Sequence, residues 1–265
     1  MTVVCHPSSH HPIPLHPIIP SPLHPIVPPG LLAKLLLFDI DGTLILSGGA
    51  GARAMMQAFE QVFGAATGIS AKEGFAGVPM AGRTDTWIFR ELARVYGVDG
   101  SVESLQRFHD TYVGHLRREI HEPGPRKGVL PGVKPLLDVL AERPEANLAL
   151  LTGNFAAGAR IKLEYFDLWR YFPTGAFAED AADRNSLFEH ALSRIEARGG
   201  PRFAPSDVVI VGDTPFDVGV ATAAGARSVA VATGSFDATA LSESGADVVL
   251  QDLSDLASVI DALGL

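Results

Sequence analysis

Cysteine is almost absent from this sequence, since Cys5 is the only one in 265 residues. A single cysteine cannot form a disulfide within the chain or supply a cysteine-rich zinc site. Basic residues are also few, with 21 Lys and Arg against 30 Asp and Glu and a net charge of −9. Such a chain is poorly suited to holding a phosphate backbone through charge, so we expect no nucleic-acid partner. No apolar stretch approaches the ~18 residues of a membrane span, so we expect a cytoplasmic protein with no membrane partner.

Charge is missing altogether from residues 1–30, which contain no Asp, Glu, Lys or Arg. The same stretch holds nine of the 19 prolines and five of the nine histidines. Frequent proline removes backbone donors and blocks helix interiors and central strands, so we expect an irregular or polyproline II tail over residues 1–33. Its scattered histidines make a poor metal site, because ordering them would cost much conformational entropy.

Short, continuous apolar runs recur through the rest of the chain. They occupy residues 35–38, 148–151, 208–211, 229–231 and 248–250, with a weaker sixth candidate at 175–178. Continuous rather than alternating apolarity indicates strands covered on both faces, as in parallel sheets. Patterns with helical spacing lie between the runs. The alternation predicts a doubly wound, Rossmann-like α/β core.

The first interval between strands is much longer than the others, at roughly 110 residues. A segment of that length needs structure of its own, and several amphipathic stripes within it are helical. We therefore expect an inserted all-helical domain over residues 47–128, with the α/β core formed by residues 34–46 and 129–265.

Polar side chains come directly after three of the predicted strands. Asp39 and Asp41 follow the first, Thr152 follows the second, and Asp213 and Asp217 follow the third. Parallel strands present their carboxyl ends at one sheet edge, where open α/β sheets bind ligands. Carboxylates at that density repel one another unless a cation is present, and hard oxygen ligands suit Mg²⁺. One carboxylate could attack a phosphorus atom while another handles protons.

The three polar segments resemble three signature motifs of the haloacid dehalogenase-like superfamily, in the same order, and the resemblance covers about residues 34–265. The matching stretches are Asp39-x-Asp41-Gly42-Thr43-Leu44, Thr152-Gly153-Asn154 and Gly212-Asp213-x-x-x-Asp217. The inserted helical region is similar to the helical cap of this superfamily, a cap that closes over small substrates.

The resemblance implies a role for each matching residue. Asp39 would be the nucleophile that forms an aspartyl-phosphate, and Asp41 would be the general acid and base. Mg²⁺ would be held by the Asp39 side chain, the main-chain carbonyl of Asp41 and Asp213, with Asp217 supporting them. Thr152 would bind a phosphoryl oxygen, and Gly42, Gly153 and Asn154 would bind substrate.

The superfamily also needs a cation between its second and last motifs, usually a lysine. We assign that role to Arg184, which precedes a predicted helix, and Lys162 is its rival. Gly82-Arg83-Thr84-Asp85 resembles the substrate-facing stretch of capped phosphatases and sugar-phosphate mutases. Arg83 is therefore a candidate contact for the leaving group.

These residues suit a Mg²⁺-dependent phosphatase of a small phosphorylated metabolite, such as phosphoglycolate or a sugar phosphate. A mutase similar to beta-phosphoglucomutase is the alternative, and a non-catalytic phospho-ligand-binding protein is a further one. Carbon–halogen and phosphonate cleavage are disfavoured, because those branches of the superfamily lack a residue like Asp41. A dinucleotide pattern at residues 49–54 begins too far beyond the first strand to be convincing. The sequence does not indicate an oligomeric state.

Overall fold

The computed structural model describes residues 33–70, 75, 77–181 and 183–265, so nearly all of the predicted tail lies outside the described residues. The core is a six-stranded parallel sheet in the order β5-β4-β1-β6-β7-β8. Its strands are β1 (Lys34–Phe38), β4 (Ala146–Leu151), β5 (Gly175–Ala176), β6 (Val208–Gly212), β7 (Arg227–Val231) and β8 (Val248–Leu250). The doubly wound α/β prediction is therefore confirmed, and each predicted apolar run is a strand of this sheet.

Helices cover both faces of the sheet because successive strand residues point to opposite sides. Leu36 and Phe38 face a cluster that also contains apolar residues of α4 (Val133–Ala141), α5 (Ala156–Tyr165) and α9 (Leu256–Leu263). Leu35 and Leu37 face α6 (Leu187–Ala197) and α7 (Pro215–Ala224) on the other side. A short helix, α8 (Ala238–Glu243), joins β7 to β8.

The order of the strands brings three loops together. β1 pairs with β4 on one side and with β6 on the other, all in parallel. The chain thus winds from β1 towards β5 in one direction and from β6 towards β8 in the other. The carboxyl ends of β4, β1 and β6 are neighbours at this switch point, which is where such sheets bind ligands.

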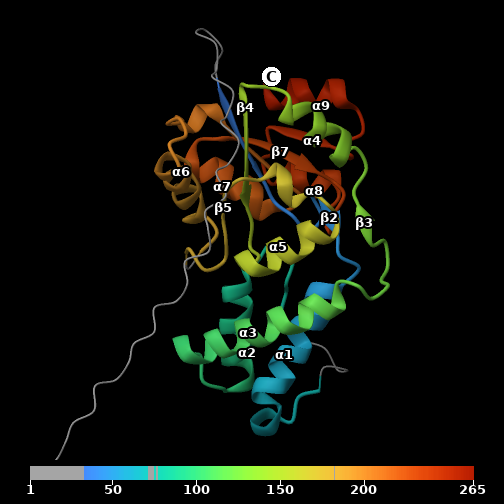
Figure 1. Ribbon diagram of the computed structural model, residues 1–265, viewed down its shortest axis with the longest axis vertical. Helices are drawn as coiled ribbons and strands as arrows, with labels where there is room; N and C mark the ends of the chain where they lie inside the picture. The colour runs from blue at the N-terminus through green and yellow to red at the C-terminus, as the bar shows by residue number, and fades with distance from the viewer. Residues whose placement is uncertain (1–32, 71–74, 76, 182) are drawn as a thin grey trace, which may run out of the picture.

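Three helices lie between two short strands that pair with each other. β2 (Ile45–Leu46) and β3 (Gly128–Val129) run antiparallel, with Ile45 opposite Val129. Between them lie α1 (Ala50–Thr67), α2 (Asp85–Tyr96) and α3 (Val102–Glu119), which gather at one end of the molecule (Figure 1). These helices share an apolar cluster built around rings such as Phe59, Phe89 and Phe108, which Phe155 and Ala178 of the core also join.

Candidate active site

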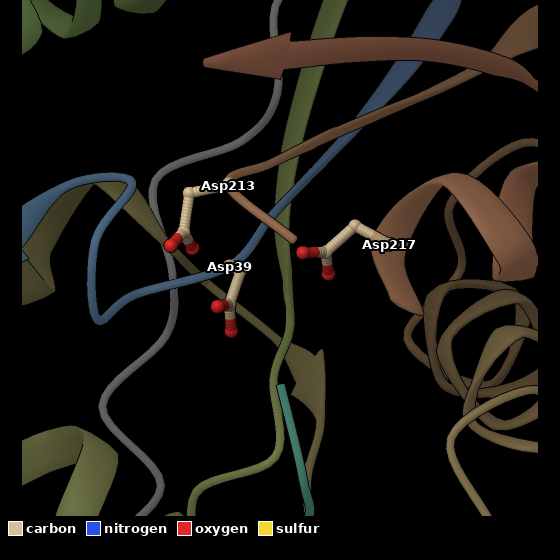
Figure 2. Close-up of side chains that lie close together, drawn as sticks. All are labelled: Asp39, Asp213 and Asp217. Carbon is tan, nitrogen blue, oxygen red and sulfur yellow. The ribbon is translucent and has the colours of Figure 1, made fainter. Parts of the chain in front are cut away.

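Three carboxylates meet at the switch point of the sheet. Asp39 follows β1, Asp213 follows β6, and Asp217 lies in the first turn of α7. Each offers an oxygen within 4.8 Å of the others, and all three side chains are buried. Figure 2 shows them pointing toward one another from separate elements. Three of the four predicted carboxylates therefore lie together in the fold, and Asp41 is not one of them.

Glycines make room for the Asp213 carboxylate. A Cβ at Gly42, whose φ is +89°, would lie 2.3 Å from Asp213 Oδ2, and one at Gly234 would lie 1.6 Å from it. The Thr43 hydroxyl donates to the other Asp213 oxygen at 3.2 Å. No side chain larger than hydrogen fits at either glycine while the carboxylate keeps this place. The predicted substrate-binding residue Gly42 thus lies against Asp213 in this structure.

Burial gives this cluster an electrostatic cost. The pKa of Asp39 is raised to about 6, mainly by burial. The Arg184 guanidinium acts in the opposite direction and lowers this pKa, whereas the nearby Asp217 carboxylate also raises it. Burial, together with Asp39 and Asp217, also holds the pKa of Asp213 well above its usual range. Buried carboxylates of this kind are favoured in the charged form when a cation joins them, and their oxygens are the ligands that a hard divalent ion prefers. The cluster fits such a cation.

Arg184 lies beside Asp39, the predicted nucleophile. Its Nη2 is 3.3 Å from Asp39 Oδ1 and 2.5 Å from Asp217 Oδ1, with all three groups buried. Burial lowers the pKa of Arg184, but Asp217 and Asp39 outweigh this and keep it above its ordinary value. The other oxygen of Asp217 accepts from the Thr214 backbone and hydroxyl, which fixes the carboxylate at the start of α7.

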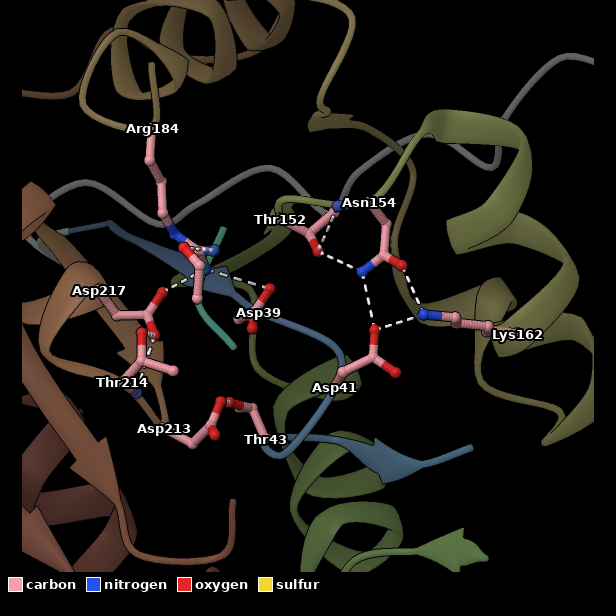
Figure 3. Close-up of polar contacts among 11 residues, drawn as sticks. Asp39, Asp41, Thr43, Thr152, Asn154, Lys162, Arg184, Asp213, Thr214 and Asp217 are labelled. Carbon is pink, nitrogen blue, oxygen red and sulfur yellow. Dashed lines mark hydrogen bonds and ion pairs between the residues drawn. The ribbon is translucent and has the colours of Figure 1, made fainter. Parts of the chain in front are cut away.

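Lys162 binds a different carboxylate. Its Nζ donates to Asp41 Oδ2 at 2.5 Å and to Asn154 Oδ1 at 2.6 Å. The Asn154 amide nitrogen donates in turn to Asp41 Oδ2 and to the Thr152 hydroxyl, each at 2.9 Å. Figure 3 shows Arg184 on the side of Asp39 and Lys162 on the side of Asp41. The two rival cations therefore have separate partners.

A segment before and within α2 lies directly on the loop after β4. The Asp85 amide donates to the Gly153 carbonyl at 2.7 Å, and the Phe155 amide donates to Asp85 Oδ2 at 2.8 Å. A Cβ at Gly153 would lie 2.3 Å from the Arg83 carbonyl oxygen. Arg184 Nη1 also donates to the Gly82 carbonyl at 3.1 Å. Residues 82–86, which we call the docking segment, thus join the helical part to the site.

One cavity of about 360 Å³ lies between the sheet edge and the helices. Its wall includes these predicted site residues: Asp39, Asp41, Gly42, Arg83, Gly153, Asn154, Lys162, Arg184 and Asp213. Thr152 and Asp217 lie behind the wall and bond to residues in it. The Arg83 guanidinium lies 4.4 Å from the ring centres of both Trp87 and Phe216, in a cation–π arrangement.

Asp85 and Tyr112 are among the cavity residues to which the sequence prediction assigns no role. Asp85 opens α2, and burial raises its pKa to about 7, against the lowering effects of Lys162 and the Phe155 amide. Tyr112 on α3 is fully buried in the cavity wall. Asp85 ends the stretch that resembles a substrate-facing segment, but an acidic residue after the N-cap Thr84 is also typical of a helix start. Tyr112 lies in an apolar stripe and carried no functional signal. The 18-residue helices of the described chain are too polar to cross a membrane.

Comparison with known proteins agrees with this fold. A haloacid dehalogenase-like hydrolase family model matches residues 33–225. A protein of Caldanaerobacter subterraneus named "Putative pyrophosphatase PpaX" is 25% identical over 233 residues, 85% of this chain and 93% of the relative. A phosphoglycolate phosphatase of Escherichia coli O157:H7 is 27% identical over 243 residues, 86% of this chain and 91% of the relative. The crystal structure of a predicted phosphatase from Clostridium acetobutylicum superposes with a TM-score of 0.64 at 19% identity, covering 88% of this chain and 100% of the other.

The fold and the site define an α/β enzyme with a buried acidic centre at the switch point of its sheet. The family match covers more than half of the chain, including all of the predicted site residues. The chain belongs to the haloacid dehalogenase-like hydrolase family.

Proposed function

We propose that this hydrolase is a Mg²⁺-dependent phosphatase that releases phosphate from a small phosphorylated metabolite through an aspartyl-phosphate on Asp39. The main support is that Asp39 and Asp41 have different partners in the site. Asp39 shares the acidic cluster with Asp213 and Asp217, whereas Asp41 is held apart by Lys162 and Asn154. This separation supports attack by Asp39 and proton transfer by Asp41.

In this mechanism the Asp39 carboxylate attacks phosphorus, and the bond to the ester oxygen breaks. Asp41 gives its proton to that oxygen, and then accepts a proton from the water that hydrolyses the aspartyl-phosphate. Arg184 and the donors at Thr152, Gly153 and Asn154 neutralise and orient the phosphoryl oxygens.

Mg²⁺ would be held by the Asp39 side chain, the Asp41 carbonyl and Asp213, with Asp217 supporting that set. The ion supplies positive charge against the phosphoryl group and the buried carboxylates. The glycine-lined space around Asp213 and its raised pKa support a cation there. No nitrogen or sulfur ligand joins the acidic cluster among the described residues, which favours a hard ion.

We further propose that residues 47–128 form a cap over the cavity. The docking segment contributes Arg83 to the cavity wall, where the guanidinium would contact the leaving group. A cavity of about 360 Å³ suits a small ligand. Phosphoglycolate or a sugar phosphate fits these limits, and the phosphoglycolate phosphatase relative supports the first.

A phosphate-release screen over small phosphomonoesters tests the proposal, run with Mg²⁺, with chelator and with the Asp39→Asn variant. We expect release from at least one small ester that needs both Mg²⁺ and Asp39. Turnover that survives chelator or the substitution would contradict the mechanism. Isomerisation of a sugar phosphate without net phosphate release would favour the mutase instead.

A further inference from the structure

Tyr112 carries a buried hydroxyl without a partner. The side chain is fully buried, with its ring stacked 6.4 Å from Phe108 and tilted 6.0 Å from Phe155. Its hydroxyl makes no hydrogen bond to any residue in the described part of the chain. Buried tyrosine hydroxyls usually find a partner, and an unpaired one costs on the order of 1–3 kcal/mol. The cluster of rings explains why the ring is there, but it does not explain the hydroxyl.

The hydroxyl lies where the helical part meets the core. An ideal Cβ at Gly158 on α5 would be 3.1 Å from the Tyr112 hydroxyl oxygen and 3.2 Å from ring atom Cε1. Gly158 therefore leaves room for this end of the tyrosine. Lys162 lies one turn further along α5, and both Lys162 and Tyr112 line the cavity.

Two polar residues of the same cavity wall have hydrogen-bond partners other than Tyr112. Lys162 bonds to Asp41 and Asn154, and Asp85 accepts from the Phe155 amide. The apolar neighbours Met55 and Ile88 offer no hydrogen bond. The Tyr112 hydroxyl thus retains the capacity both to donate and to accept in this part of the wall.

We propose that Tyr112 determines specificity by hydrogen-bonding an oxygen of the leaving group. The site would then select phosphomonoesters whose leaving group carries a hydroxyl or carboxylate beyond the ester oxygen. In the proposed mechanism Asp39 holds the phosphoryl end at the sheet edge, and Tyr112 on α3 belongs to the helical part of the same cavity wall. A site built to bond a substrate oxygen rejects an analogue that lacks it. This inference rests on the proposed phosphatase function.

Three two-carbon substrates test it: ethyl phosphate, 2-hydroxyethyl phosphate and 2-phosphoglycolate, which differ only at the terminal group. For wild type, Tyr112→Phe and Tyr96→Phe, kcat/KM is measured on each, together with the thermal midpoint. In Tyr112→Phe we expect the kcat/KM ratio of an oxygenated substrate to ethyl phosphate to fall about tenfold, the effect of losing one hydrogen bond. A fall for one oxygenated substrate only identifies the bonded group. Tyr96 lies in the same helical part but outside the cavity wall, so its variant should keep the wild-type ratios.

The thermal midpoint separates specificity from structure. Removing an unpaired buried hydroxyl should leave the midpoint unchanged or raise it. Unchanged ratios, or an equal loss on all three substrates with a lower midpoint, would overturn the role of Tyr112. Asp39-dependent turnover of ethyl phosphate by wild type upholds the phosphatase proposal even in that case. If wild type releases phosphate from none of the three substrates, the result counts against both proposals.

Discussion

Arg184 and Lys162 are both buried cations, yet they neutralise different carboxylates. Arg184 bonds to Asp217 and lies near Asp39, whereas Lys162 bonds to Asp41. A planar guanidinium can contact two carboxylates and a phosphoryl group together, which a lysine ammonium does less well. This placement supports the proposal that Arg184 is the cation for phosphoryl transfer and that Lys162 positions Asp41.

Replacing Arg184 by Ala should lower kcat at least 100-fold, because attack by Asp39 would lose the charge that offsets the phosphoryl group. Lys162→Met should lower kcat less, since Asn154 still bonds to Asp41. Steady-state kinetics under saturating Mg²⁺ measure both effects, with Arg184→Lys as the conservative control. If Lys162→Met proves the more damaging change, the assignment of Arg184 is wrong.

Asp85 should make folding stability depend on pH. Its pKa is about 7 in the folded state, raised by burial from 3.8. At a pH between these two pKa values, the folded protein keeps a proton on Asp85 that the unfolded chain loses. The free energy of unfolding should therefore fall as pH rises, by on the order of 1 kcal/mol per pH unit. The loss is complete above pH 7.

The midpoint of thermal unfolding, measured from pH 4 to 8 in the presence of a chelator, should therefore fall less steeply with pH for Asp85→Asn than for wild type. The exposed Asp261 serves as the control, and Asp261→Asn should follow the wild-type curve. Parallel curves for Asp85→Asn and wild type would contradict the assignment.

At the scale of elements, the docking segment is what joins the helical part to the catalytic loops. Besides its bonds to Gly153 and Phe155, the segment is held by the Thr86 hydroxyl, which donates to the Ala178 carbonyl at 2.8 Å. The same segment carries Arg83 into the cavity. Its contact with the loop after β4 would therefore link the proposed closure of the cap to the proposed phosphate-binding residues.

Gly153→Ala should push the docking segment away from the loop after β4, because the added Cβ would lie 2.3 Å from the Arg83 carbonyl oxygen. We expect kcat/KM to fall more than tenfold while circular dichroism stays unchanged. Gly114→Ala in α3 is the matched control, since a Cβ there meets nothing, and it should add about 0.5–1 kcal/mol of stability. Equal activity in the two variants would show that this contact is not needed.

At the scale of the whole molecule, the net charge of −9 does not describe the cavity. Its wall holds four acidic residues and four basic ones, listed here as Asp39, Asp41, Asp85, Asp213, Arg83, Arg126, Lys162 and Arg184. An anionic substrate therefore meets a nearly balanced site on an acidic protein, and a divalent cation would make it net positive.

Mg²⁺ should stabilise the protein more at pH 8 than at pH 5.5. Burial raises the pKa of Asp39 to about 6 and that of Asp213 well above its usual range, so at low pH the ion must displace protons. The rise in thermal midpoint with added Mg²⁺ measures this, and Asp213→Asn should abolish it. Asp207→Asn, far from the cluster on the loop before β6, should keep it. An equal rise in the Asp213 variant would mean that Mg²⁺ binds elsewhere.

Much of the fold could be predicted because its local signals are strong. The runs at 35–38 and 208–211 are short, apolar and followed at once by aspartates, and both are strands. The candidate at 175–178 was weaker, and β5 covers only Gly175–Ala176, because Ala178 already turns to bond with the Asn154 carbonyl. Tyr112 and Asp85 could not be assigned, because their functional surroundings come from α5 and the loop after β4, far away in sequence.

By itself, the sequence determined the parallel sheet and the set of carboxylates at its edge, because apolar runs and the residues after them are local properties of the chain. Only the tertiary structure decided which cation pairs with which carboxylate, since the reach of Lys162 depends on how α5 packs and that of Arg184 on the loop before α6. It also decided that Tyr112 and Asp85 face the cavity, because burial and pairing depend on segments that meet only when the helical part rests on the sheet edge.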